Sequence, residues 1–167
     1  MFAYCRHLTT VPELNVSSVT NMESMFRECD ALTTIPQFNT SNVTNMYHMF
    51  DGCDALTSVP LLDTSKVTTM SGMFSGCKQL TSVPQLNTSN VTDMRQMFSS
   101  CNGLTTIPQL DTSKVKFMDT MFYFCINLTT VPALDVSNVT SMMNMFANCG
   151  RLKSILMTNI GADLQIS

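Results

Sequence analysis

An unbroken 24-residue repeat constrains the fold of this 167-residue chain more than any other feature. The stretch "MFRECDALTTIP" at residues 25–36 returns as "MFDGCDALTSVP" at residues 49–60, with Met, Phe, Cys, Leu and Pro in the same positions. The Met-Phe pair keeps this spacing from one end of the chain to the other. A short fixed period is typical of stacked repeats, in which each unit contacts only its neighbours.

The repeat also predicts the domain organisation. We expect a single solenoid over residues 1–167, with six 24-residue units in 1–144 and a degenerate C-terminal unit or cap in 145–167. A cap is expected because the last repeat has Leu156 in the proline position. Met1 stands in the position of Met25, so the chain starts within a repeat and is expected to be a piece of a longer protein.

Each unit has two halves with different patterns. In the first half, Val19, Met22, Met25, Phe26 and Cys29 have the spacing of one helix face, which predicts a short helical segment across V-T-x-M-x-x-M-F. An Asn or Asp with Ser two residues later precedes it, as at a helix N-cap. The second half, L-T-x-[IV]-P, predicts a strand of about three to five residues, kept short by its proline.

Together these halves predict an α/β solenoid of the leucine-rich-repeat kind. We expect a right-handed stack of about seven coils, with short parallel strands on one face and helical segments on the other. The apolar side chains would form continuous ladders inside, because no single unit buries its own apolar face.

Composition excludes little, but it does not recommend a polyanion as a partner. Only 13% of residues are charged, for a net charge of −3. Lys66, Lys114 and Lys116 are scattered rather than grouped in a basic patch, which disfavours nucleic acid as a partner. No stretch approaches the roughly 18 apolar residues of a membrane span, and no secretion-signal pattern precedes the repeats.

All seven cysteines occupy one repeat position. A metal site is disfavoured because single thiols 24 residues apart, with only His7 and His48 as further ligands, lack metal-ligand spacing. Disulfides between neighbouring coils fit by distance, but buried free thiols are favoured because the required side-chain angle is rare in register. This predicted structural ladder comprises Cys5, Cys29, Cys53, Cys77, Cys101, Cys125 and Cys149.

The string M-F-x-x-C-x-x-L-T-x-[IV]-P, joined through [ND]-[TV]-S-x-V-T-x-M, resembles the BspA-like leucine-rich repeat family. It is most similar to the branch with repeats of 24 to 26 residues found in mycoplasma-type lipoproteins and bacterial surface proteins. The resemblance covers residues 1 to about 155. It implies a cell-surface or secreted scaffold with adhesive or host-interaction roles and no enzymatic activity.

The sequence leaves three functional hypotheses open. The first is adhesion, or binding to a host protein, cell-surface protein or glycan. The second is a spacer or a filament subunit that associates end to end. The third, less favoured, is ice binding through threonine ladders, because neighbouring strand residues would point to opposite sides and only one threonine file could share a face.

For binding, two sets of side chains are candidates. The first set consists of aromatic residues in repeat positions that are usually polar. Exposed aromatic side chains are the usual anchors of protein interfaces. They are Tyr47, Phe117, Tyr123 and Phe124. A uniform polar face would suit a glycan or a repetitive polymer. It comprises Thr33, Thr57, Thr81, Thr105, Gln37, Gln85 and Gln109.

Nothing in the sequence indicates catalysis. The two histidines lie in unrelated repeat positions, and G-x-S-x-G, H-E-x-x-H and a Gly-rich phosphate loop are all missing. We therefore expect neither an enzyme nor a cofactor.

Overall fold

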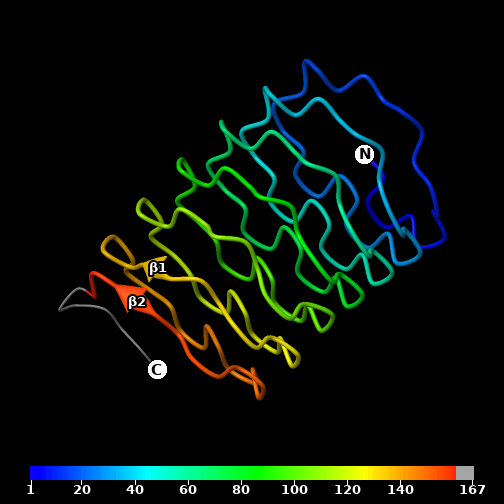
Figure 1. Ribbon diagram of the computed structural model, residues 1–167. Helices are drawn as coiled ribbons and strands as arrows, with labels where there is room; N and C mark the ends of the chain where they lie inside the picture. Colours follow the sequence, from blue (N-terminus) through cyan, green and yellow to red (C-terminus); the bar gives the residue numbers. More distant parts are fainter. Residues whose placement is uncertain (161–167) are drawn as a thin grey trace.

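The computed structural model describes residues 1–160, and it shows one coil per repeat with successive coils side by side (Figure 1). Parallel bridges connect one position of each coil to the next. They join Asn21, Asn45, Thr69, Asp93, Phe117 and Ser141 in chain order. The predicted repeat solenoid is therefore confirmed, but these parallel bridges lie in the segment predicted to be helical and not at L-T-x-[IV].

The prediction of helical segments is wrong, because residues 1–160 contain no helix. The segments are chains of tight turns instead. In the first of them, Met25 N–H bonds to Met22 O and Cys29 N–H bonds to Phe26 O, both at 3.2 Å. Within each turn, the two buried side chains are three residues apart in the sequence. This spacing overlaps with that of a helix face, which explains why the apolar pattern predicted a helix.

We call residues 20–32 and their 24-residue equivalents the turn side. Here every second backbone N–H points to the next coil. The N–H groups of Met22, Ser24, Phe26 and Glu28 bond to carbonyls one coil on, at 2.7 to 2.9 Å. Ser24 and Glu28 adopt left-handed backbone, with φ of 52° and 56°. A helix would use these N–H groups within its own segment, so the turns leave them free to hold the stack.

We call residues 33–40 and their equivalents the proline side, where side chains bridge the coils. Gln37 Nε2 donates to Leu61 O at 2.6 Å, and Gln85 Nε2 donates to Gln109 O at 2.7 Å. The buried Thr40 hydroxyl donates to the Asp63 carbonyl at 3.0 Å. Side-chain donors serve here because proline has no N–H.

Only two strands form within residues 1–160, and each has two residues, so the prediction of three to five residues at L-T-x-[IV] is wrong. Strand β1 (Leu134–Asp135) pairs in parallel with β2 (Met157–Thr158). The coil of β1 carries Ala133 and Val136 where the inner coils carry Gln or Leu and Thr. Without the glutamine and threonine donors of the inner coils, the two backbones bond directly, at 3.0 Å, and the Thr158 hydroxyl donates to Leu134 O at 3.3 Å.

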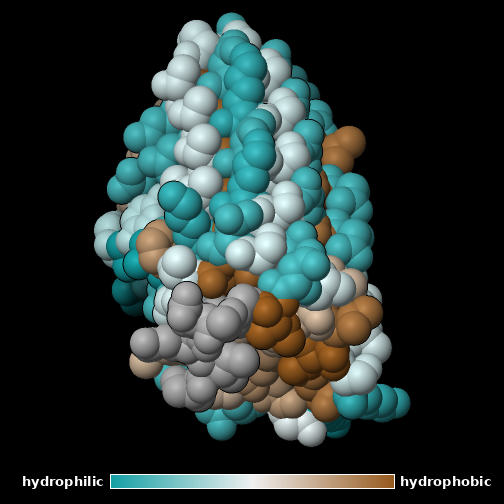
Figure 2. All heavy atoms as spheres, turned by 90° about the vertical axis from the view of Figure 1, so that its left-hand side faces the viewer, coloured by the Kyte–Doolittle hydropathy of each residue, from teal (hydrophilic) through white to brown (hydrophobic). Residues whose placement is uncertain are grey.

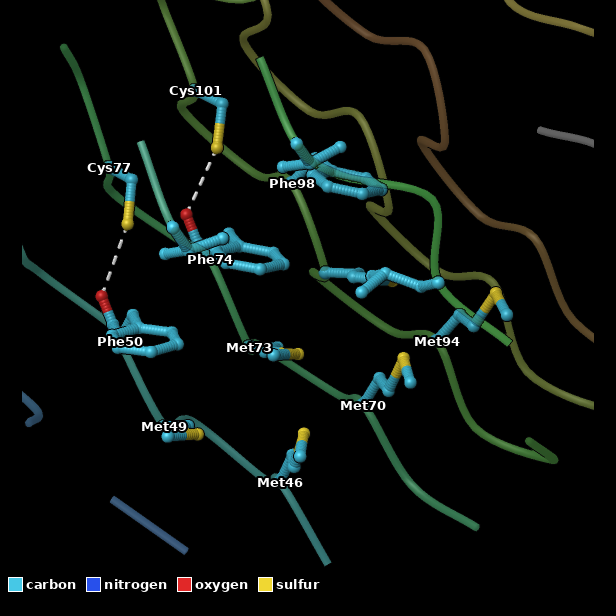
Figure 3. Packing of buried hydrophobic residues seen from close by; sticks show 14 of the residues in the cluster. Met46, Met49, Phe50, Met70, Met73, Phe74, Cys77, Met94, Phe98 and Cys101 are labelled. Carbon is cyan, nitrogen blue, oxygen red and sulfur yellow. Dashed lines mark hydrogen bonds between the residues drawn. The ribbon is translucent and has the colours of Figure 1, made fainter. Parts of the chain in front are cut away.

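The core consists of ladders of identical side chains (Figure 3). Phenylalanine rings from adjacent coils stack with centroids 5.4 to 5.8 Å apart and planes within 12° of each other. The stack comprises Phe2, Phe26, Phe50, Phe74, Phe98, Phe122 and Phe146. Methionines such as Met46 and Met49 fill the space beside it and are fully buried. The stack thus buries what no single coil could.

The cysteines form a second ladder with a bonding role. All seven are free; five are buried, Cys149 is half-buried and Cys5 is exposed. Each thiol after the first donates to the phenylalanine carbonyl of the preceding coil, as from Cys77 to Phe50 at 3.2 Å (Figure 3). Burial raises the pKa of the Cys125 thiol to about 12. The ladder therefore keeps its protons, as S–H donation requires.

The predicted N-cap residues close corners rather than cap helices. Asn39 Oδ1 accepts from the backbone N–H and the hydroxyl of Ser41, at 3.2 and 2.8 Å. Where aspartate takes this position, the bonds from serine lower its pKa, as for Asp63 beside Ser65. The sequence thus predicted which residues form a side-chain-stabilised turn. The helix expected after that turn does not form. Residues 161–167 of the predicted cap lie outside the described residues.

Candidate binding surface

All four aromatic candidates lie exposed on the turn side. Tyr47, Phe117 and Tyr123 are each 37% exposed, and Phe124 is 43% exposed. Tyr123 and Phe124 have ring centroids 6.0 Å apart. The structure therefore places Phe117, Tyr123 and Phe124 on the same coil, with Tyr123 and Phe124 next to each other, and places Tyr47 three coils away. We call these three residues the aromatic patch.

Phe117 gives up a structural role that its equivalents serve. In the four coils from Asn21 to Asp93 this position holds a side-chain oxygen that accepts the N–H two residues on, as from Tyr47 to Asn45 at 2.9 Å and from Arg95 to Asp93 at 3.0 Å. A phenyl ring accepts no such bond. Phe117 instead lies 5.1 Å from the Arg95 guanidinium carbon, in a cation–π contact.

Phe124 also departs from what its position favours. It has φ of 60°, in the left-handed region where glycine is least strained. Its equivalents in two inner coils are Gly52 and Gly76, with φ of 73° and 72°. A bulky ring at such a position costs stability, and local rules are broken most often where function requires it.

On the predicted polar face, the three glutamine amides and one of the four threonine hydroxyls are already engaged. Besides Gln37 and Gln85, Gln109 Nε2 donates to the Ala133 carbonyl at 2.8 Å. In the threonine file, Thr57 Oγ donates to Thr33 O at 3.2 Å. The face on the β1 and β2 side carries columns of hydrophilic side chains along the stack (Figure 2).

The threonines differ from the prediction in one respect. Thr33 and Thr34 are both exposed, between the buried Leu32 and Ile35. The expectation that only one file could share a face assumed a strand, whose neighbouring residues point to opposite sides, and this segment does not alternate like a strand. Thr81 and Thr105 continue the first file and are also exposed.

Sequence reasoning missed other exposed apolar side chains. Leu61 is 61% exposed on the proline side, in the position that holds glutamine in three other coils. Ile126 and Met143, at 40% and 47%, lie on the turn side. A comparison of each repeat position could have found them, because all three stand where other coils carry polar residues.

Within residues 1–160, no group of three or more His, Cys, Asp or Glu side chains could hold a metal ion. In the same part of the chain, no helix is long and apolar enough to cross a membrane.

The stacked coils define a repeat solenoid built from short turns. The chain belongs to the family described as "Mycoplasma protein of unknown function, DUF285", whose model matches residues 1–103 and 57–159. This confirms the resemblance to the BspA-like leucine-rich repeat proteins. Among curated proteins, none matches this chain.

Two solved structures are similar to the chain at low identity. A leucine-rich cell surface protein from Faecalibacterium prausnitzii A2-165 is 18% identical over 94% of this chain and 62% of its own, with a TM-score of 0.40. A leucine-rich repeat protein from Bacteroides ovatus ATCC 8483 is 14% identical over 89% of this chain and 66% of its own, with a TM-score of 0.35. The chain thus spans less than two thirds of the first protein's length.

Proposed function

We propose that this chain is a non-enzymatic repeat scaffold, displayed at a cell surface or secreted, that binds a partner protein through the aromatic patch. The surface location rests on the resemblance to BspA-like proteins. The observation that carries the binding role is that Phe117 and Phe124 stand exposed in positions where the coil itself favours Asn or Asp and Gly.

Three features support a protein as the partner. The patch offers aromatic side chains, which are typical interface anchors. Ile126, in the same coil, extends the exposed apolar surface, and its N–H bonds to Phe124 O at 3.0 Å. The polar face is a weaker candidate, because its glutamine amides already donate to neighbouring coils. The exposed residues of the turn side can vary without loss of contacts between coils, because backbone N–H and C=O groups make those contacts.

The test exchanges each aromatic residue for the residue type found at its own repeat position. The variant carries Phe117→Asn, Tyr123→Ser and Phe124→Gly, which correspond to Asn45, Ser99 and Gly76. Beads coated with each protein would be counted on host epithelial cells. We expect the triple variant to lose adhesion while its urea-unfolding midpoint stays at or above that of the wild type.

The matched control is Gln85→Ala with Gln109→Ala on the proline side. This pair should retain adhesion but lose stability, because two bonds between coils are removed. Adhesion that survives the triple variant but not the glutamine pair would transfer the binding site to the polar face. Equal adhesion by all three proteins and by uncoated beads would rule out adhesion through this chain.

End-to-end association is the second predicted function, and it stays a prediction. Sedimentation of the chain over a range of concentrations measures it. A monomer at all concentrations would contradict it.

A further inference from the structure

A shallow groove of about 220 Å³ crosses the turn side apart from the aromatic patch. It is lined by Tyr47, Ser71, Arg95, Gln96, Asp119 and Thr120. Tyr47, Ser71, Arg95 and Asp119 occupy the same repeat position in four successive coils. Ser71 is buried, with 4% exposure, between the larger side chains of the coils on either side. The groove exists because this one position varies in size along the stack.

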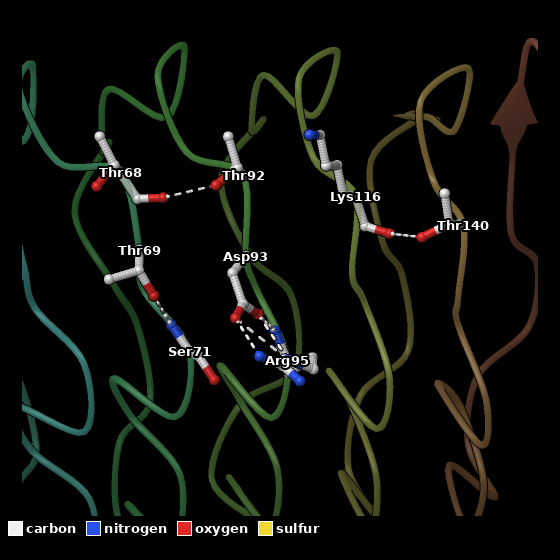
Figure 4. A network of polar contacts seen from close by, with 8 residues as sticks. All are labelled: Thr68, Thr69, Ser71, Thr92, Asp93, Arg95, Lys116 and Thr140. Carbon is white, nitrogen blue, oxygen red and sulfur yellow. Dashed lines mark hydrogen bonds and ion pairs between the residues drawn. The ribbon is translucent and has the colours of Figure 1, made fainter.

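Arg95 is held in place before any ligand arrives. Its Nε lies 3.0 and 3.2 Å from the two Asp93 carboxylate oxygens, and its Nη2 lies 2.6 Å from Asp93 Oδ2 (Figure 4). The ring of Phe117 supports the guanidinium from the next coil. No bond from Nη1 is found within residues 1–160. Arg95 therefore offers a preorganised donor whose charge Asp93 already balances.

Asp119 supplies an acceptor on the neighbouring coil. Its Oδ1 accepts from the Ser141 hydroxyl and from Met143 N–H, the latter at 3.0 Å. Its Oδ2 has no protein donor among the described residues. One oxygen thus fixes the carboxylate and the other is left to accept from a ligand.

The remaining lining groups narrow the class of ligand. Tyr47 presents a partly exposed ring, which suits a flat apolar face of a ligand, and Ser71 and Thr120 add hydroxyls. Because Asp93 neutralises Arg95, the charge of Asp119 is uncompensated and disfavours an anion. A neutral ligand with closely spaced hydroxyls, each both donor and acceptor, and an apolar C–H face satisfies all of these groups.

We propose that this groove binds a single neutral pyranose ring, with the sugar's C–H face on Tyr47 and its hydroxyls shared between Arg95 Nη1 and Asp119 Oδ2. The volume is smaller than the usual range for larger ligands, so it accommodates one ring of a glycan. None of the three patch residues lines the groove, although the Phe117 ring contacts the Arg95 guanidinium from the next coil.

The test is saturation-transfer NMR with the whole chain and a panel of methyl glycosides: glucoside, galactoside, mannoside and N-acetylglucosaminide. We expect at least one to bind saturably with a Kd of about 1 to 10 mM, the range for a ligand of this size. Tyr47→Ala and Asp119→Asn should each weaken that binding roughly tenfold, equivalent to about 1.4 kcal/mol. Tyr47→Trp should retain it.

Tyr123→Ala is the matched control, because Tyr123 has the same 37% exposure as Tyr47 but lies outside the groove. It should leave glycoside binding unchanged. Asp119→Asn keeps the side-chain shape, so it remains informative should Tyr47→Ala fail to fold. N-acetyl-lysine methylamide serves as a cationic probe. No saturable glycoside, unchanged affinity in both groove variants, or binding of the lysine probe alone would overturn the proposal.

Discussion

The turn side and the proline side bridge the same gap between coils by different means. On the turn side, backbone groups bond to backbone groups, as from Phe26 N–H to Met49 O at 2.9 Å. On the proline side, glutamine and threonine side chains reach the next coil's carbonyls, as from Thr88 to Asp111 at 2.9 Å. Hydrogen bonds between backbone groups do not depend on which side chain a residue carries. The turn side can therefore vary its exposed residues without losing these bonds, whereas each change of Gln or Thr on the proline side removes a bond between coils.

The C-terminal coils show that the two means are alternatives. Between β1 and β2, Ala133 and Val136 remove the side-chain donors, and the backbone bonds from Leu134 and Val136 replace them. The candidate binding residues follow the same division. The aromatic patch and the proposed sugar groove both lie on the turn side, where the backbone bonds between coils do not depend on the exposed side chains.

The largest effect we expect is alkaline unfolding that originates on the turn side, where all the thiols lie. Burial raises the pKa of Cys53, Cys77, Cys101 and Cys125 above the ordinary value of 9.0. A raised pKa in the folded state gives stability that is complete below pH 9.0 and is lost as pH rises from there toward about 12.

Each buried thiol that ionises only on unfolding lowers the free energy of unfolding as pH rises above 9.0, and the four losses add, on the order of several kcal/mol at pH 10. Urea midpoints at pH 7, 8, 9 and 10 measure the loss. The double variant Cys77→Ala and Cys101→Ala should show a shallower fall than the wild type. A midpoint that stays level from pH 8 to 10 would show that the thiols ionise as freely in the folded state as in the unfolded one.

Gly72→Ala tests whether the turn side accepts a larger side chain at a crowded position. Its added Cβ would lie 2.4 Å from two atoms of the His48 ring, at a φ of 62°. The ring cannot easily move away, because Nδ1 is 2.9 Å from Asp51 Oδ2 and the side chain is 12% exposed. We expect a loss of about 2 to 3 kcal/mol from clash and backbone strain.

A double-mutant cycle separates the two causes. In a His48→Ser background, Gly72→Ala should cost only about 1 kcal/mol, the part that belongs to the backbone. Equal costs in both backgrounds would mean that the ring is not in contact with Gly72.

The sequence predicted the period, the core ladders and the parallel stacking, because buried identical residues at a fixed spacing allow few other arrangements. It could not separate turns from helices, since both place apolar residues three or four apart. A signal was nevertheless present. Gly52, Gly72 and Gly76 occupy two positions four residues apart within the supposed helix, and glycine is costly there unless left-handed backbone is required.

The site was less predictable than the fold. Unusual aromatics such as Phe117 could be recognised in the sequence because each repeat serves as a reference for the others. The groove could not, because it depends on how Tyr47, Ser71 and Arg95 align across three coils and on which atoms of Arg95 the neighbouring Asp93 already engages.

One Thr→Val substitution on each side compares the proline side with the turn side directly. Thr88→Val removes the buried bond to Asp111 O on the proline side and should cost about 1 to 2 kcal/mol, because that carbonyl loses its side-chain donor. Thr92→Val removes the hydroxyl bond to Thr68 O, which keeps a backbone donor at 2.9 Å. It should cost less than about 0.5 kcal/mol, as for an exposed substitution. Urea denaturation measures both variants. Similar losses in their free energies of unfolding would mean that the two sides depend equally on their side-chain bonds.

The smallest effect has the opposite sign. Phe124→Gly should raise the free energy of unfolding by about 1 kcal/mol, because left-handed backbone at a φ of 60° penalises a bulky residue but not glycine. The gain is modest, since glycine also increases the entropy of the unfolded chain and the ring's contact with Tyr123 is lost. Ser100→Gly, at the same repeat position with φ of 58°, is the matched control and should gain a similar amount. Urea denaturation measures both. A gain in Ser100→Gly with a loss in Phe124→Gly would mean that the Phe124 ring stabilises the coil, and its exposure would then need no partner to explain it.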